Sequence, residues 1–123
     1  MFQPETNLMF YVDDVAKEKT FWQAIGFEIS EIAEMMGFLS FEMKPHPESH
    51  LLIRVYAKDF IRQVSPEVLD MAPSLLFESS DLAGLHKKIE AVTSQISPIV
   101  QEPFPNFNFA NPSGHYFAVT GIS

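Results

Sequence analysis

The stretch NLMFYVDDVA at residues 7–16 returns in altered form as SLLFESSDLA at residues 74–83. Each stretch opens with an alternating segment, which is typical of a strand with one apolar face. Each then reaches an aspartate that can cap the first turn of a helix. With a shift of 67 positions (74 − 7), four residues coincide, namely Leu8 with Leu75, Phe10 with Phe77, Asp14 with Asp81 and Ala16 with Ala83. The echo predicts two copies of one structural unit.

The first copy predicts a strand, a helix and three further strands. After a strand at 7–12, a helix starts at an Asp13 or Asp14 cap and stops at Gly26, which suits a left-handed C-terminal residue. Apolar residues at helical spacing give this helix a buried stripe of Val15, Phe21, Trp22 and Ile25. The further strands are predicted at 27–33, 38–43 and 51–57.

The second copy repeats this order. Residues 58–73 show no alternation and are predicted to be a connector with a short helical turn around 66–69. A strand at 74–79 then precedes a helix that runs from a Ser80 or Asp81 cap to about Val92. Later strands are predicted at 97–101, 106–110 and 115–121, the last after the turn NPSG at 111–114.

The predicted fold is therefore α+β, with two βαβββ modules that bury their apolar faces together. The chain has 123 residues, which is the size of a single domain. The modules are expected at about 5–57 and 74–121, joined by the connector.

Composition excludes several classes of protein. A net charge of −8 opposes binding to nucleic acid, and the absence of cysteine removes disulfides and thiolate chemistry. No apolar run approaches the roughly 20 residues of a membrane helix, and the N-terminus MFQPETN has no signal-peptide pattern. We expect a cytoplasmic protein with neither a nucleic-acid nor a membrane partner.

Two segments resemble a known family. YVDDVAKEKTFWQAIGFE, at 11–28, resembles the opening of the vicinal oxygen chelate superfamily, which includes glyoxalases, bleomycin resistance proteins and extradiol dioxygenases. FNFANPSGHYFAV, at 107–119, resembles its closing turn and last strand, with Asn111 where Asp is usual. The resemblance implies a curved mixed sheet with a concave cleft and with helices on the outer face. Because the superfamily contains both enzymes and pure binders, the resemblance is specific for a fold rather than a reaction.

The family's metal ligands come from four strand positions on the concave face. By the resemblance these positions fall at Asn7, at Arg54 or its neighbour Ile53, at Ser74 and at Ala118. Arginine is a fixed cation that repels a metal ion, and alanine has no donor atom. The prediction is a chain of the metal-free branch, with no metal site and no cofactor.

Strand alternation predicts which residues line the cleft. One apolar set is expected to pack beneath the helices: Leu8, Phe10, Val12, Ile53, Val55, Leu75, Phe77, Phe117 and Val119. From the opposite face we predict these ligand-binding residues: Asn7, Met9, Tyr11, Arg54, Tyr56, Ser74, Glu78, Tyr116 and Ala118. Such a mixture of aromatic, apolar and a few polar groups is typical of small-molecule sites. No nucleophile–base pair is visible, so no catalytic residue is predicted.

Several of these residues have two interpretations. Arg54 either holds a ligand's carboxylate or phosphate, or pairs with Glu78 or another side chain across the cleft. The three tyrosines either stack on a planar ligand or simply fill the cleft. The phenylalanine-rich run at 102–112 is a lid, a dimer contact or an ordinary core strand. The four histidines are expected to be structural or solvated, with His86 on the solvated side of its helix.

The function predicted from these observations is binding of a small molecule by a homodimer, which would sequester a drug or metabolite. Three alternatives stay open from the sequence. The first is a metal-dependent lyase, isomerase or dioxygenase of the same superfamily, and the second is a metal-free enzyme that uses Tyr, Glu78 or Arg54. The third is a stand-alone domain that acts through a protein partner.

Overall fold

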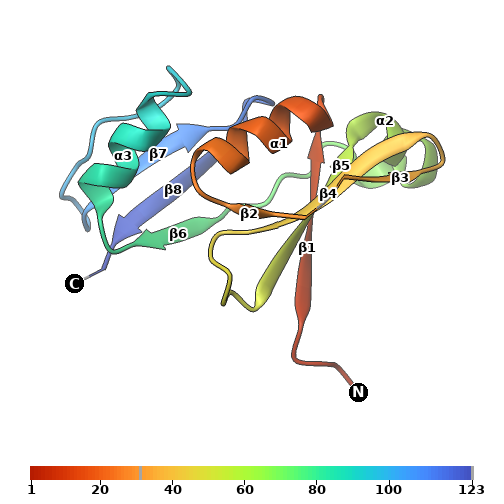
Figure 1. Cartoon of the computed structure of the whole chain (residues 1–123), viewed down its shortest axis with the longest axis horizontal. Coiled ribbons are helices and arrows are strands. Elements are labelled where there is room, and N and C mark those ends of the chain that lie inside the picture. Colours follow the sequence, from red (N-terminus) through yellow and green to blue (C-terminus); the bar gives the residue numbers. More distant parts are fainter. Residues whose placement is uncertain (31, 123) are drawn as a thin grey trace. The chain divides into compact units, whose positions relative to one another are not determined.

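A computed structural model describes residues 1–30 and 32–122 (Figure 1). The chain divides into two compact units, Met1–Pro73 and Ser74–Ser123. The described residues form an α+β structure with three α-helices and two mixed sheets, one sheet in each unit. The predicted α+β class is confirmed, whereas the concave cleft stays a prediction.

The first unit contains five strands and two α-helices among its described residues. In chain order these are β1 (Thr6–Val12), α1 (Val15–Ala24), β2 (Glu28–Ile29), β3 (Ala33–Met35), β4 (Phe38–Lys44), β5 (Leu51–Ala57) and α2 (Lys58–Val64), followed by a 3₁₀ turn at Pro66–Val68. The sheet has the order β1-β5-β4-β2, and β3 also pairs with β4. β1 runs parallel to β5, and the other pairs are antiparallel.

The helix α1 covers the apolar face of this sheet. Asp14 is its N-cap, since the Asp14 carboxylate accepts a bond from the Lys17 amide at 3.1 Å. Trp22 is fully buried, and its ring meets Phe10, Phe21 and Phe27 at centroid distances of 6.2, 5.3 and 4.6 Å. All four residues of the predicted helix stripe are buried. The prediction that Trp22 belongs to the core is confirmed.

The second unit repeats the opening of the first. Its elements are β6 (Leu76–Ser79), α3 (Leu82–Glu90), β7 (Asn106–Ala110) and β8 (Tyr116–Gly121), and its sheet has the order β6-β8-β7. β6 runs parallel to β8, as β1 does to β5. Asp81 caps α3 by accepting from the Gly84 amide at 3.0 Å, just as Asp14 caps α1. The sequence echo therefore marks equivalent positions in the two units.

The predicted burial pattern holds for most of the chain. Of the nine residues expected beneath the helices, six are fully buried and three are half-buried, the latter being Leu8, Leu75 and Phe77. In the phenylalanine-rich run, Phe107 and Phe109 belong to a core strand, while Phe104 is 43% exposed. For these two residues the core interpretation is correct.

Three predicted elements differ from the structure. The expected strand at 27–33 is divided into the short strands β2 and β3, and residue 31 lies outside the described residues. The expected strand at 97–101 reaches β7 only through isolated bridges at Ile96 and Val100, because Pro98 between them has no amide hydrogen for a ladder. The connector at 58–73 begins with the helix α2, which the sequence analysis missed.

His86 is also placed differently from expectation. Its ring packs edge-on against Phe107 at 4.9 Å, and its Nε2 lies 2.8 Å from the Ser97 carbonyl oxygen. The residue is half-buried rather than on the solvated side of α3. His86 thus joins α3 to the segment before β7.

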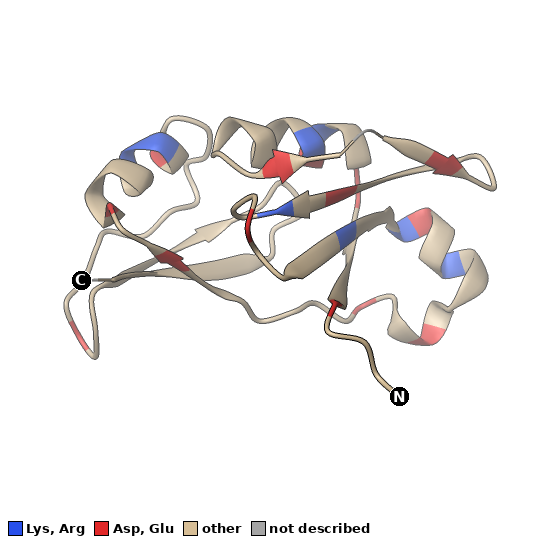
Figure 2. Ribbon diagram, turned by 60° about the horizontal axis from the view of Figure 1, so that its bottom comes forward, with Lys and Arg blue, Asp and Glu red and all other residues tan. Residues whose placement is uncertain are grey.

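Acidic residues occur on strands and helices of both units (Figure 2). No helix in the described part of the chain has the length and hydropathy that crossing a membrane requires.

Candidate functional site

The side of the first sheet opposite α1 contains the predicted ligand-binding residues of this unit. Directly paired residues on neighbouring strands project to the same side, so the register defines rows across the sheet. One row contains Tyr11, Tyr56 and Ser40, and the next contains Met9, Arg54 and Glu42. Five of the predicted ligand-binding residues are thereby brought to one face: Asn7, Met9, Tyr11, Arg54 and Tyr56.

Arg54 lies at the centre of this face, on a strand flanked by β1 and β4. Its Nε donates a hydrogen bond to Oδ1 of Asn7 at 3.2 Å. Its Nη2 lies 3.7 Å from Oε1 of Glu42, and the two side chains are 43% and 41% exposed. The acidic neighbour that the structure gives Arg54 is therefore Glu42 on the adjacent strand.

A pocket of about 150 Å³ opens beside Arg54. Its lining residues are Ser30, Ala33, Met35, Ser40, Phe41, Glu42, Arg54 and Tyr56. A second pocket of about 120 Å³ shares Ser30 and Glu42 with the first and extends to Glu28, Ile29, Met43, Lys44 and Leu52. Because drug-sized ligands occupy several hundred Å³, each pocket has the size of a subsite for one chemical group.

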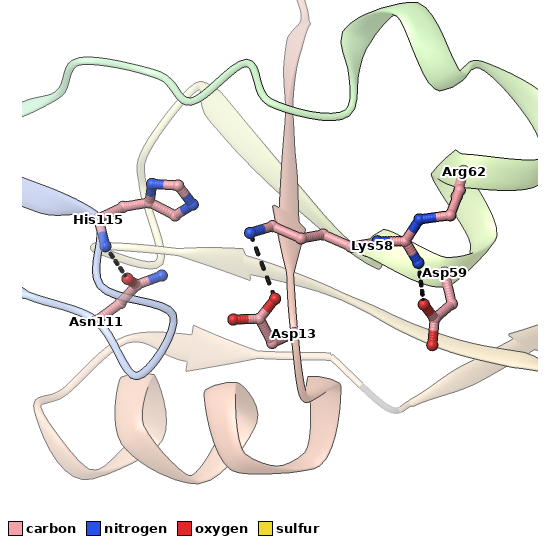
Figure 3. A network of polar contacts seen from close by, with 6 residues as sticks. All are labelled: Asp13, Lys58, Asp59, Arg62, Asn111 and His115. Atoms are coloured by element: carbon pink, nitrogen blue, oxygen red, sulfur yellow. Dashed lines mark hydrogen bonds and ion pairs between the residues drawn. The ribbon is translucent and has the colours of Figure 1, made fainter.

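Tyr56 is supported by the helix that the sequence analysis missed. Its ring stacks on Phe60 of α2 at 5.8 Å with an interplanar angle of 28°, and Phe60 also meets Phe38 at 5.8 Å. An ion pair from Lys58 to Asp13 at 3.3 Å ties the start of α2 to the end of β1 (Figure 3). One face of the Tyr56 ring is therefore covered by Phe60, and Tyr56 also lines the pocket.

The other four predicted site residues belong to the second unit. Register places Leu76 beside Ala118 and Glu78 beside Thr120, on the exposed side of that sheet. Tyr116 is 62% exposed and lies on the same side of β8 as Ala118. Ser74 precedes β6 rather than lying within it, because the strand starts at Leu76.

The residues at the family's metal positions do not fit a metal ion. Asn7 already accepts a bond from Arg54, whose guanidinium is a permanent cation. Ala118 offers no donor atom. Within residues 1–30 and 32–122, no group of three or more His, Cys, Asp or Glu side chains is arranged to hold a metal. We therefore derive no chemistry through a metal.

Two further histidines have local contacts within turns. The His115 amide donates to Oδ1 of the buried Asn111 at 2.8 Å, which closes the predicted NPSG turn (Figure 3). Gly114 in that turn has a φ of +86°, a conformation that glycine adopts without strain. His46 Nδ1 accepts a bond from the Glu48 amide at 3.1 Å.

Sequence reasoning missed Ser30, Ser40 and Glu42 at this site. Strand alternation could have identified Ser40 and Glu42, since both alternate with the buried residues Phe41 and Met43. Alternation assigns them to the polar face, but only the register of β4 with β5 places Glu42 beside Arg54. Ser30 joins the site because its Oγ accepts a bond from the Glu42 amide at 2.9 Å.

Known structures share this fold over their full length, although no protein-family model and no curated protein sequence matches the chain. TnmS3, an antibiotic-binding protein from Streptomyces sp. CB03234, has a TM-score of 0.78 at 15% identity, with 99% of this chain and 98% of that chain covered. A bleomycin-binding protein in complex with bleomycin has a TM-score of 0.64 at 16% identity, with both chains covered completely at 100%.

The fosfomycin resistance protein FosX from Listeria monocytogenes has a TM-score of 0.70 at 16% identity, with 100% of this chain and 96% of that chain covered. At these identities the likeness is one of fold. The sequence resemblance is confirmed at that level, because the chain shares the fold of these three proteins.

Proposed function

We propose that this protein binds a small, partly aromatic organic molecule and sequesters it without chemical conversion. The observation that carries the proposal is the pocket beside Arg54, where a guanidinium, a carboxylate, hydroxyl groups and an aromatic ring converge. Small-molecule sites typically combine apolar and aromatic walls with a few placed polar groups. The structural neighbours named for binding antibiotics support the same class of function.

The proposed site extends beyond the two pockets, because each is too small for a whole drug-sized molecule. We assign to it the five predicted residues on this face of the first sheet, namely Asn7, Met9, Tyr11, Arg54 and Tyr56, together with Ser30, Ser40 and Glu42. The other four, Ser74, Glu78, Tyr116 and Ala118, stay predicted ligand-binding residues of the second unit. A concave cleft of the kind that the family resemblance implies stays a prediction. The homodimer and the cytoplasmic location predicted from the sequence are part of the same proposal.

The proposal is tested with a ligand panel and a matched pair of variants. The panel contains bleomycin, planar aromatic acids and planar aromatic amines, and binding is measured by thermal shift and calorimetry. Ala33→Leu enlarges an exposed side chain in the pocket, whereas Ala24→Leu makes the same change at the exposed end of α1.

We expect at least one compound to bind the unmodified protein. Its affinity should fall by about tenfold or more in Ala33→Leu, because the added side chain occupies a subsite of the ligand. Ala24→Leu should bind as the unmodified protein does. Equal binding by both variants would exclude the pocket as the site, and a panel without any binder would count against the proposed function.

A further inference from the structure

The geometry points to Arg54 as the anchor for a ligand's carboxylate. This inference rests on the proposed function and names the ligand class, an aromatic or apolar body that carries one carboxylate. The superfamily resemblance implies a metal ligand at Arg54 or at its neighbour Ile53, and of the two only Arg54 carries a charge. In this protein the fixed cation of that site would be the guanidinium.

The orientation of the guanidinium is set by the neighbouring strand. Asn7 accepts the Nε hydrogen of Arg54 at 3.2 Å, which restricts rotation of the guanidinium plane. Arginine has five N–H donors, and four of them are on the two Nη nitrogens. Because a carboxylate binds best to a paired set of N–H donors, the Nη edge is the part of Arg54 that would receive it.

Glu42 does not occupy this edge as a hydrogen-bonded partner. Its Oε1 lies 3.7 Å from Nη2, beyond the 2.7–3.2 Å range typical of such bonds. Both side chains are about two-fifths exposed, so the Glu42 carboxylate can turn toward water when an anion arrives. Glu42 then acts as a competitor that weakens anion binding without preventing it.

Arg54 is a better anchor than Glu42 because it is already held in place. Arg54 has a hydrogen bond to Asn7, and a preorganised donor loses less freedom when a ligand binds. The described contacts of the Glu42 side chain comprise only the longer approach to Nη2. Tyr56 and Met35 line the same pocket and provide contact surface for the apolar body of the ligand.

Three probes of the same shape separate the possible ligand classes: 2-naphthoate, naphthalene-2-carboxamide and 2-naphthylmethylammonium. Affinities for the full chain are measured by calorimetry. The Nη–H signals of Arg54 are followed by ¹⁵N NMR as a direct reading of the contact. The variants are Arg54→Gln, Glu42→Gln and Arg62→Gln, of which Arg62→Gln removes an exposed arginine of α2 outside the pocket.

We expect naphthoate to bind about tenfold more tightly than the carboxamide, as a charge-assisted bond to a half-exposed guanidinium allows. Arg54→Gln should abolish this preference while the melting temperature is retained, because the two probes then meet the same neutral side chain. Glu42→Gln should raise the preference for naphthoate over the carboxamide by several-fold, because the competing negative charge is removed. Arg62→Gln should change neither affinity.

Other outcomes overturn the inference in distinguishable ways. Equal binding of naphthoate and carboxamide would remove the carboxylate anchor and leave the proposed function standing. Tightest binding of the ammonium probe, with loss in Glu42→Gln, would make Glu42 the anchor of a cationic ligand. Absence of binding by all three probes would overturn the inference, whereas the proposed function would still stand if the wider panel contained a binder.

Discussion

Glu18 is a carboxylate with no exposed surface, located in the aromatic core of the first unit. Its Oε1 accepts a hydrogen bond from Nε1 of Trp22 at 3.1 Å, one helical turn further along α1. A buried polar group is costly unless it is hydrogen-bonded, so each partner of this pair requires the other. The apolar helix stripe predicted from the sequence contained Trp22 and left out Glu18.

Replacing Glu18 with alanine should lower the free energy of unfolding by about 1–3 kcal/mol, because the buried indole N–H loses its acceptor. Urea denaturation followed by fluorescence measures this directly, since Trp22 is the single tryptophan. Lys17→Ala, at an exposed position on the same helix, is the control and should change stability by less than about 0.5 kcal/mol. Equal stability of the two variants would contradict the structural role of Glu18.

At the scale of elements, the sequence predicts best where its pattern is long and continuous. The strand at 51–57 has its predicted bounds, and both capping aspartates occupy N-caps. The helix α2 was missed because its apolar residues Phe60, Ile61 and Val64 span little more than one turn. In addition, Ala57 at its N-cap provides no side-chain hydrogen bond, so the usual start signal is absent.

For the candidate site, too, the sequence pattern predicts some features and not others. Alternation places Arg54 and Tyr56 on the polar face, because the face of a residue depends only on its position along a strand. Alternation does not identify the neighbour on the next strand, which depends on the register that the loop between β4 and β5 sets. Glu42, which lies beside Arg54, could therefore not be found from the pattern alone. The same holds for Phe60, which stacks on Tyr56 from a helix that the pattern did not predict.

The hairpin between β3 and β4 leads to a prediction about stability. Met36 and Gly37 form its two-residue loop, with φ angles of +54° and +83°, as in a type I′ turn. Methionine pays a steric penalty at positive φ that asparagine tolerates better. Met36→Asn should raise the free energy of unfolding by about 0.5–1 kcal/mol.

The matched control is Met71→Asn, since Met71 is 66% exposed and Met36 is 67% exposed. Met71 has no positive φ, so the control removes the same side chain without relieving backbone strain. Chemical denaturation of both variants measures the difference. A destabilised Met36→Asn protein would mean that contacts of the methionine side chain outweigh the strain of its backbone.

At the scale of the whole molecule, the net charge opposes the proposed anion anchor. A chain with a charge of −8 repels a carboxylate at long range, while Arg54 attracts it only at short range. Salt screens both interactions, with a Debye length of about 10 Å at 0.1 M. For a carboxylate ligand, we therefore expect added salt to raise the association rate and also the dissociation rate.

Stopped-flow measurements with naphthoate between 0.02 and 0.5 M salt, chosen to span about 4–20 Å of screening length, would test this expectation. The uncharged carboxamide is the control, and neither of its rates should depend on salt. An association rate for naphthoate that falls with salt would mean that a positive local field steers the ligand. In that case the net charge would not govern the approach.

The size of the two units leads to a last prediction about cooperativity. The second unit comprises 50 residues (123 − 74 + 1), with three strands and one α-helix among those described. Domains of this size are marginal on their own, because they bury too small a share of their surface. We therefore expect the 123-residue chain to unfold in one transition, as the single domain predicted from the sequence would.

Two probes follow the two units separately during denaturation. Trp22 fluorescence reports on the first unit, and NMR signals of Phe107, Phe117 and Val119 report on the buried strands of the second. Coincident midpoints are expected, because neither unit should persist once the other has unfolded. If the second unit lost its signals at a clearly lower denaturant concentration, the chain would consist of two independent folding units, and the single-domain prediction would be wrong.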